Sequence, residues 1–397
     1  MKNSTTENFF DHPKEKSKIK VYIVTEFFKT YFSIINNRGF SREIYYIDLF
    51  CGPGIYKDGT RSTPLVLLDI VDNFKDDDIR NKLIMIFNDE KQEFYNTLSQ
   101  QVKQHPVYPK LKHKPIILNK KASEVDLSKY YSNKKPNFSF IDPWGYIDVS
   151  AEQVSNLVKS IGSDCVLFFN SNRILQDLGK PHSKEHMKKI FEDRFDAALA
   201  VQKDSMLSQC VKAHKFVSLF SQNLYDTYFR VLKDQGYRLF VLPFSVEQDE
   251  VEKISHYLLF ITKNHKAVRE MKKIMLKKSN TSTEVLGYDN KDVLTISLFS
   301  RESDVFLGVK KCFKNLFKAF PSLKNKPYTI DKWLEHIDAY SMSINYEVTP
   351  YTSDEIKMCI EKWDDEGKID IKIPGGKRIK KRITNDREFS FNDGFEV

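Results

Sequence analysis

Residues 45–54, with the sequence YYIDLFCGPG, constrain the fold of this chain more than any other segment. Their aromatic and β-branched residues predict a buried strand, which ends in Asp48 before a turn containing Gly52 and Gly54. Glycine lacks a Cβ, so the backbone amides of such a turn can approach a ligand closely. A strand followed by a glycine turn is typical of the βα unit with which α/β folds bind nucleotides.

The glycine turn lacks the features of the two common phosphate-binding loops. No third glycine completes GxGxxG, and no Lys-Ser or Lys-Thr pair completes a P-loop. An acid just before the turn instead suits a ligand that carries both an ammonium group and an adenosine, such as S-adenosylmethionine (SAM). We expect Asp48, Phe50, Gly52 and Gly54 to bind SAM. The alternative is a plain turn between a strand and a loop.

Predicted strands and helices alternate over the first half of the chain. The segments that predict strands are 44–50, 82–89, 114–120, 137–143 and 164–170. Helical patterns lie between them at 64–74, 90–103 and 150–161, and an amphipathic helix at 15–37 precedes the first strand. This alternation predicts an α/β fold in which helices cover both faces of a parallel sheet.

Two later strand segments, 237–246 and 255–262, are separated by only eight residues. A parallel connection needs about a dozen residues or more, so these strands are expected to pair antiparallel. A parallel sheet that ends in an antiparallel hairpin is typical of class I SAM-dependent methyltransferases, which have a Rossmann-like fold. Within this domain, predicted over 44–280, we expect a helical insertion at about 174–211 and helices at 212–233 and 265–278.

Acids also follow the second predicted strand. We expect Asp89 to accept hydrogen bonds from the ribose hydroxyls of SAM, with Glu90 as the main competitor for this role. Acids at this position are also ordinary helix caps, and the sequence leaves that alternative open.

The fourth predicted strand leads into Asp142, Pro143 and Trp144, at the edge where open α/β sheets place their chemistry. This segment resembles the (Asp/Asn)-Pro-Pro-aromatic signature of amino-group methyltransferases. An amine conjugated to a ring is a poor nucleophile because its lone pair is delocalised. The Asp142 carboxylate and the Pro143 carbonyl can accept its N–H protons, while Trp144 stacks on the base. The alternative is a turn that carries a buried tryptophan.

The C-terminal region has a different pattern. We expect an N-terminal helical extension at 1–43 before the core domain and a helical connector at 281–325 after it. Beyond the connector, short helices lead into a basic hairpin around residues 374–376, and this pattern predicts a winged-helix-like domain over 326–397. Five basic residues of the hairpin are expected to contact nucleic acid phosphates: Lys377, Arg378, Lys380, Lys381 and Arg382. A solvated edge strand protected by lysines is the alternative.

The composition of the chain limits which partners, metal sites and cellular locations are expected. The formal net charge of +9 fits a polyanionic partner without requiring one. The five cysteines are scattered and form no CxxC pair, so neither a zinc site nor a disulfide framework is predicted. The first residues are polar and no apolar run approaches the length of a membrane span. We therefore expect a cytoplasmic protein without a metal site.

Residues 10–280 resemble the three-Cys-motif partner (TcmP) family, bacterial proteins with a methyltransferase-like core. The matching segments are 12–16 (HPKEK), 47–54 (IDLFCGPG), 62–65 (STPL), 87–90 (FNDE), 140–145 (FIDPWG) and 256–262 (HYLLFIT). The resemblance implies a SAM-binding Rossmann-like domain and a partner, the three-Cys-motif protein, which is similar to radical-SAM enzymes. One departure is Asn119, which follows the third strand where such enzymes commonly have an acid near the adenine.

These observations favour a SAM-dependent methyltransferase that modifies an amino nitrogen of a base in DNA or RNA. Two alternatives remain open at this point. The chain is a catalytically silent subunit that uses the same fold to bind a second protein, or a winged-helix regulator that binds nucleic acid and senses a metabolite.

Overall fold

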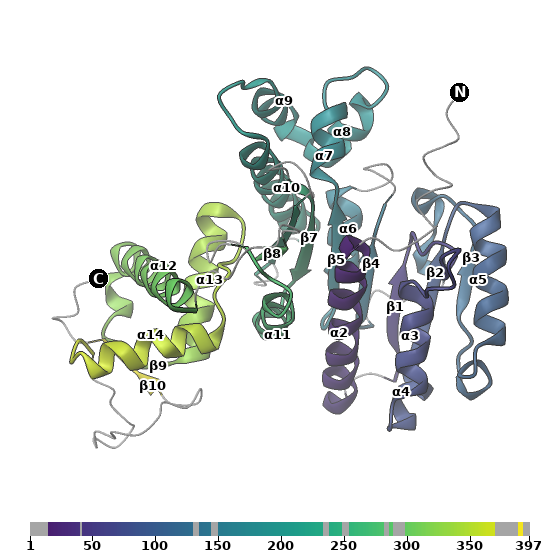
Figure 1. Cartoon of the computed structure of the whole chain (residues 1–397), viewed down its shortest axis with the longest axis horizontal. Helices are drawn as coiled ribbons and strands as arrows, with labels where there is room; N and C mark the ends of the chain where they lie inside the picture. The colour runs from purple at the N-terminus through teal and green to yellow at the C-terminus, as the bar shows by residue number, and fades with distance from the viewer. Residues whose placement is uncertain are drawn as a thin grey trace.

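The computed structural model describes residues 15–39, 42–129, 135–143, 150–232, 238–247, 254–281, 286–288, 298–369 and 388–391. Figure 1 gives the labels of the helices and strands. Within these residues, no helix combines the length and the apolar character needed to cross a lipid bilayer.

An eight-stranded sheet with the order β3-β2-β1-β4-β5-β7-β6-β8 forms the centre of the molecule (Figure 1). Its strands are β1 (Ile44–Asp48), β2 (Leu83–Asn88), β3 (Ile116–Leu118), β4 (Asn137–Ile141), β5 (Asp164–Phe169), β6 (Phe240–Glu247), β7 (Ile254–Thr262) and β8 (Gly287–Tyr288). The first five strands run parallel, and β7 pairs antiparallel with both β5 and β6. The predicted parallel sheet and its antiparallel hairpin are thus confirmed. The short β8, parallel to β6, was not predicted.

Helices cover both faces of this sheet. Those of the core are α2 (Glu15–Arg38), α3 (Thr63–Asp72), α4 (Asp77–Lys82), α5 (Gln92–Gln104), α6 (Ala151–Val158), α10 (Gln209–Leu232) and α11 (His265–Leu276). Short 3-10 turns are η2 (Tyr108–Lys110), η3 (Ala122–Glu124) and η4 (Leu127–Lys129). Helix α2 contacts α3 and α11 on one face, whereas α6 and α10 contact each other on the opposite face.

Helix α2 belongs to the core of the sheet domain. Its apolar side chains recur every three or four residues, and four aromatic ones are almost fully buried: Phe27, Phe28, Tyr31 and Phe32. The Phe27 ring lies 5.2 Å from Phe138 of β4 and 4.7 Å from Phe260 of β7. The helix therefore packs across the centre of the sheet, and this fixes the direction in which its polar side chains point.

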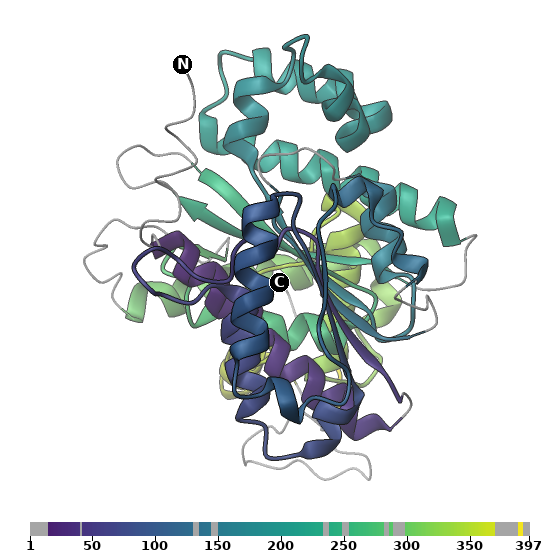
Figure 2. The same cartoon turned by 90° about the vertical axis from the view of Figure 1, so that its right-hand side faces the viewer.

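The residues between β5 and α10 are helical, as expected for an insertion. They form α7 (Ser171–Asp177), α8 (Lys184–Phe191), η5 (Glu192–Arg194) and α9 (Phe195–Lys203). Figures 1 and 2 both show these helices at the top of the molecule, beyond the carboxyl end of β5. They therefore lie at the edge of the sheet where the carboxyl ends of the parallel strands meet.

The C-terminal residues form a second, aromatic-rich core. Its elements are α12 (Leu298–Ala319), η6 (Pro321–Leu323), β9 (Tyr328–Thr329), α13 (Ile330–Asn345), α14 (Ser353–Asp365) and β10 (Glu388–Phe389), with β10 antiparallel to β9. Trp333 and Trp363 are buried against Phe313 and Phe391. The predicted basic hairpin with Lys377, Arg378, Lys380, Lys381 and Arg382 lies outside the described residues.

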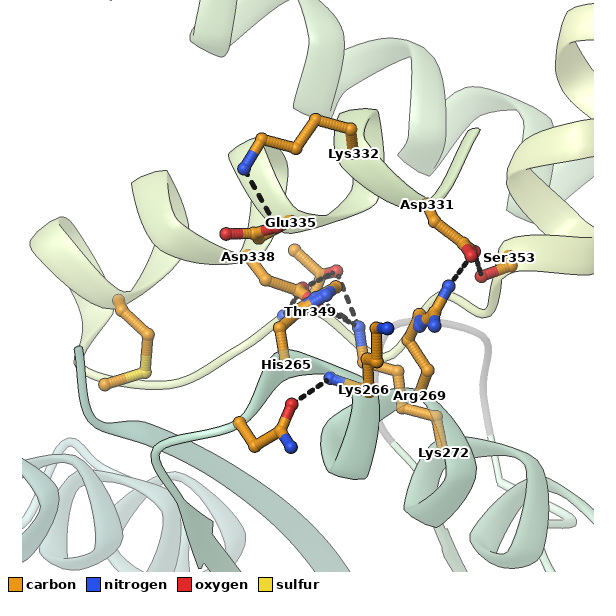
Figure 3. A network of polar contacts seen from close by, with 12 residues as sticks. His265, Lys266, Arg269, Lys272, Asp331, Lys332, Glu335, Asp338, Thr349 and Ser353 are labelled. Atoms are coloured by element: carbon orange, nitrogen blue, oxygen red, sulfur yellow. Dashed lines mark hydrogen bonds and ion pairs between the residues drawn. The ribbon is translucent and has the colours of Figure 1, made fainter. Parts of the chain in front are cut away.

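A buried polar network joins this C-terminal unit to the sheet domain (Figure 3). Lys272 of α11 and Asp338 of α13 are both fully buried and form an ion pair, with Lys272 Nζ 2.7 Å from Asp338 Oδ2. His265 contacts the same oxygen at 2.8 Å, and Thr349 donates to Oδ1 through its backbone N–H and its hydroxyl. Burial alone would raise the pKa of Asp338, but Lys272 and His265 hold it below its ordinary value. The carboxylate is therefore ionised and fully hydrogen-bonded.

Glu347 is buried at the same junction but lacks such partners. Its Oε1 has no hydrogen-bond partner among the described residues, and burial raises its pKa to about 8. The folded protein thus keeps this proton up to about pH 8, whereas in the unfolded chain the carboxyl ionises above its ordinary value of 4.5. Because the unfolded chain gives up the proton first, the free energy of unfolding falls as the pH rises through this interval.

We therefore predict that Glu347→Gln stabilises the protein at alkaline pH. The gain in the free energy of unfolding over wild type should be near zero at pH 4 and a few kcal/mol at pH 9, with an upper bound of about 5 kcal/mol. Urea denaturation at both pH values measures the difference. A gain that is equal at the two pH values would contradict this assignment.

Candidate active site

Three acids lie at the carboxyl edge of the sheet, at the ends of neighbouring strands. Asp48 is the last residue of β1, Asp89 follows β2, and Asp142 follows β4. Strands β2 and β4 flank β1, and Asp48 is in register with Phe87 and Phe140. Since the carboxyl ends of parallel strands meet at one edge, the fold brings together the three acids that the sequence singled out.

Asp48 is almost completely buried, with 1% of its surface exposed. Its Oδ1 accepts a hydrogen bond from the Phe50 backbone N–H at 3.1 Å, and its Oδ2 accepts one from the Tyr46 hydroxyl at 3.4 Å. Burial raises the pKa of Asp48 to about 8, and the nearby charges of Asp142 and Asp89 add to this effect. Without a cation bound beside it, Asp48 is mostly protonated at pH 7.

The loop after β1 adopts the backbone conformation that favours glycine. Gly52 and Gly54 have φ angles of 66° and 82°. A Cβ on Gly54 would lie 2.7 Å from Leu98 Cδ1, so packing against α5 also excludes larger residues there. At Gly54 the backbone conformation and the packing against Leu98 both require glycine, and the predicted contact of this loop with SAM stays a prediction.

The same loop is tied to the end of β2. The Gly52 N–H donates to Asp89 Oδ2 at 3.0 Å, and the Cys51 N–H donates to the Asn88 carbonyl at 3.0 Å. The amide of Gly52 is therefore already bonded to a protein group. Asp89 also accepts from the Lys91 N–H at 2.9 Å, and burial raises its pKa. Each carboxylate oxygen keeps acceptor capacity for a ligand hydroxyl.

Glu90 and Asn119 differ from Asp89 in their surroundings. The Glu90 side chain is exposed, so it is free to turn toward a ligand at this edge. The Asn119 amide donates to the backbone carbonyls of Asp89 and Glu90, at 2.9 and 3.0 Å. Asn119 thus fixes the turn after β2, a structural role that the sequence did not indicate.

Asp142 makes an ion pair that sequence reasoning missed. Its Oδ2 contacts the ammonium of Lys20 on α2, and both side chains are largely buried. Lys20 Nζ also lies 5.0 Å from the centre of the Phe168 ring, and the centres of the Phe168 and His256 rings are 4.4 Å apart. The available signal was the direction of α2: a helix leading directly into β1 has its first turns at the carboxyl edge. Pro143 is buried after β4, and Trp144 lies outside the described residues.

Comparison with known proteins gives only distant similarities. No family model matches this sequence, and no curated protein sequence is detectably similar to it. Among solved structures, a Legionella pneumophila protein has a TM-score of 0.32 and 9% identity, with 61% of this chain and 84% of that chain covered. A SAM-dependent methyltransferase from Methanosarcina mazei has a TM-score of 0.29 and 11% identity, with 58% of this chain and 96% of that chain covered. The methyltransferase domain of a bacterial Hen1 protein has a TM-score of 0.31 and 10% identity, with 62% of this chain and 99% of that chain covered.

With TM-scores below 0.5, none of these similarities decides the fold, which rests on the sheet itself. The strand order, the antiparallel β7 and the acids at the carboxyl edge define an α/β protein with a class I methyltransferase-like sheet. The resemblance to three-Cys-motif partner proteins stays a prediction.

Proposed function

We propose that this protein binds SAM at the carboxyl edge of its sheet and methylates an amino nitrogen of a nucleic acid base. The observation that carries the proposal is the cluster of Asp48, Asp89 and Asp142, two of which have a raised pKa. Such a cluster is prepared for a cationic ligand, because a bound positive charge relieves both burial and mutual repulsion.

The chemistry of the acid cluster fits SAM better than a phosphorylated nucleotide. SAM carries an ammonium and a sulfonium, whereas phosphates would be repelled by acids at this edge. In this proposal Asp48 holds the ammonium, and Asp89 with Glu90 accepts the ribose hydroxyls. When bound, SAM supplies a methyl group that is already activated for transfer.

The acceptor side of the site is assigned to Asp142, Pro143 and Trp144. The Asp142 carboxylate and the Pro143 carbonyl accept the N–H groups of the target amine and orient its lone pair. Asp142 already pairs with Lys20, so binding of an amine has to exchange this contact for a new one. Trp144 is proposed to stack on the base.

The nucleic acid would be held by the C-terminal unit. Three helices and the antiparallel pair β9–β10 fit the element order of a winged helix, and the hairpin predicted from the sequence would lie between α14 and β10. The residues proposed to contact phosphates are Lys377, Arg378, Lys380, Lys381 and Arg382.

Protonated Asp48 leads to a prediction about SAM binding. The ammonium of SAM should lower the pKa of Asp48 from about 8, so binding at pH 7 should release close to one proton. The affinity should therefore rise from pH 6 toward pH 8 and fall at higher pH, where the amino group of SAM itself loses its proton. Calorimetry in buffers of different ionisation enthalpy measures the released proton directly.

The matched control for this prediction is Asp48→Asn. This variant should bind SAM at least about tenfold more weakly, and its binding enthalpy should no longer depend on the buffer. Wild-type binding without proton release would remove Asp48 from the cofactor site.

The activity itself is tested by incubating the protein with SAM carrying a labelled methyl group and with total DNA or RNA. Label in an N-methylated base, found by mass spectrometry after digestion, is the expected result. Label on protein or small molecules alone would retain the methyltransferase and reject the nucleic acid acceptor.

A second candidate function is a catalytically silent subunit that binds a radical-SAM-like three-Cys-motif protein. The Lys20–Asp142 ion pair favours it, because the carboxylate proposed to receive the amine is already occupied by a group of the same chain. A folded sample that binds no SAM in calorimetry would favour this function, whereas SAM binding without methyl transfer would fit a regulator instead.

A further inference from the structure

A basic cavity lies at the junction of the sheet domain and the C-terminal unit, away from the acid cluster. It has a volume of about 720 Å³, and its wall includes Ile161 and Gly162 before β5, Phe240 at the start of β6, and Thr329 of β9. Because these residues precede or begin β5 and β6, the cavity opens at the amino end of β5, opposite the carboxyl edge. The molecule thus has an acidic site at one edge and a basic one at the other.

Cationic side chains converge on this cavity from both of its walls. Six of them line it: Arg38, Arg238, Lys263, Lys266, Arg269 and Lys332. Asp331 and Glu335 are the two acids in the wall, and each already pairs with one of these cations, Arg269 and Lys332 respectively. Figure 3 shows Lys266 and Arg269 on α11 facing Asp331, Lys332 and Glu335 on α13.

The other four cations are only partly compensated by acids within the described part of the chain, since Asp164 attracts Lys263 and Arg38 without forming an ion pair with Arg38. Arg38, Arg238 and Lys266 form no ion pair with a described residue. Lys263 donates to the Lys159 carbonyl, and burial lowers its pKa to about 8. Converging cations repel one another, so the arrangement is most stable when an anion is bound among them.

We propose that this cavity binds a phosphorylated small molecule with at least two neighbouring phosphates. Arginine presents planar N–H pairs that match phosphate oxygens, and two of the unpaired cations are arginines. The volume lies within the range of about 300–1,000 Å³ for small-molecule sites. The cations face one another across a cavity rather than following a line over the surface, which favours a compact ligand over a nucleic acid strand.

Such a ligand would contact both parts of the molecule. Arg38, Lys263 and Lys266 belong to the sheet domain, whereas Lys332 belongs to α13. Binding should therefore hold α13 against α11 and raise the melting temperature with ligand concentration.

The proposal is tested with inorganic tripolyphosphate as the probe, titrated into the full-length protein by calorimetry. Wild type is expected to bind with 1:1 stoichiometry and with an affinity that falls as salt is added. The variant Arg38→Gln/Arg238→Gln/Lys266→Gln should bind at least about 30-fold more weakly, and its melting temperature should no longer respond to the probe.

A charge-matched control removes three exposed lysines elsewhere: Lys29→Gln/Lys188→Gln/Lys273→Gln. Each of these lysines pairs with a glutamate three residues earlier on its own helix and lies outside the cavity. This control should bind tripolyphosphate like wild type. The single variant Lys266→Gln, which changes one exposed side chain, should weaken binding about fivefold or more without altering the melting temperature of the free protein.

Three outcomes would overturn the proposal. The first is no binding of tripolyphosphate by wild type, and the second is an equal loss of tripolyphosphate affinity in the cavity variant and in the charge-matched control. The third is a cavity variant that binds tripolyphosphate like wild type but has lost affinity for a single-stranded oligonucleotide without terminal phosphates. The last result would assign the cavity to a nucleic acid backbone instead.

Discussion

Replacing Asp142 with alanine should reduce methyl transfer to nucleic acid by about 10²- to 10³-fold while leaving the SAM dissociation constant within about twofold. The carboxylate is proposed to orient the acceptor amine and not to contact the cofactor, so the loss should appear in kcat. Single-turnover assays with labelled SAM, together with calorimetry of SAM binding, separate the two quantities.

Lys20→Gln is the matched variant for this prediction. It breaks the same ion pair but keeps the Asp142 carboxylate available to an amine. If Asp142 acts on the acceptor, Lys20→Gln should keep or increase transfer. If the ion pair serves only to fix α2 against the sheet, both substitutions should lower activity to the same extent, and Asp142 loses its proposed role.

Lys272→Met should lower the free energy of unfolding by about 3–5 kcal/mol, the largest stability effect we expect for a single polar side chain here. The substitution leaves the fully buried Asp338 without its main countercharge, although His265 and Thr349 still contact it. The pKa of Asp338 is lowered in wild type, so its contribution is present at neutral pH and is lost as the medium becomes acidic. The difference between variant and wild type should therefore shrink in acid.

Urea denaturation at pH 7 and in acid measures this effect, and Lys273→Met is the control on the next residue. Lys273 is 45% exposed and pairs with Glu270, so its replacement should change stability by less than about 1 kcal/mol. Asp338→Leu combined with Lys272→Met should cost less than the two single changes added together. Additive costs would show that the two side chains are not coupled.

The sheet was largely predictable because its signals are local. Buried strands and the helices between them appear as short apolar runs and helical periodicity, and the short link between β6 and β7 excludes a parallel crossover. The acids of the candidate site were also predictable, because a residue that follows a parallel strand must lie at the carboxyl edge. Strand β8 was not predicted, since two residues carry no periodicity.

The contacts that give the acids their properties were not predictable in the same way. Lys20 and Asp142 are 122 residues apart, and Lys272 and Asp338 are 66 residues apart. No sequence spacing relates such pairs. The packing of Gly54 against Leu98 and the hydrogen bond from Gly52 to Asp89 were likewise not predictable, and the predicted contact of both glycines with SAM stays a prediction.

The sequence by itself determined which segments become strands, where their acids emerge, and that the turn after β1 needs glycine. Only the tertiary structure decided that Asp48 is buried enough to stay protonated, that Asp142 meets Lys20, and that cations from four separate segments surround one cavity. The physical reason is that burial and charge pairing depend on which distant surfaces meet, and hydrophobic packing of α2, α11 and α13 fixes this after local structure has formed.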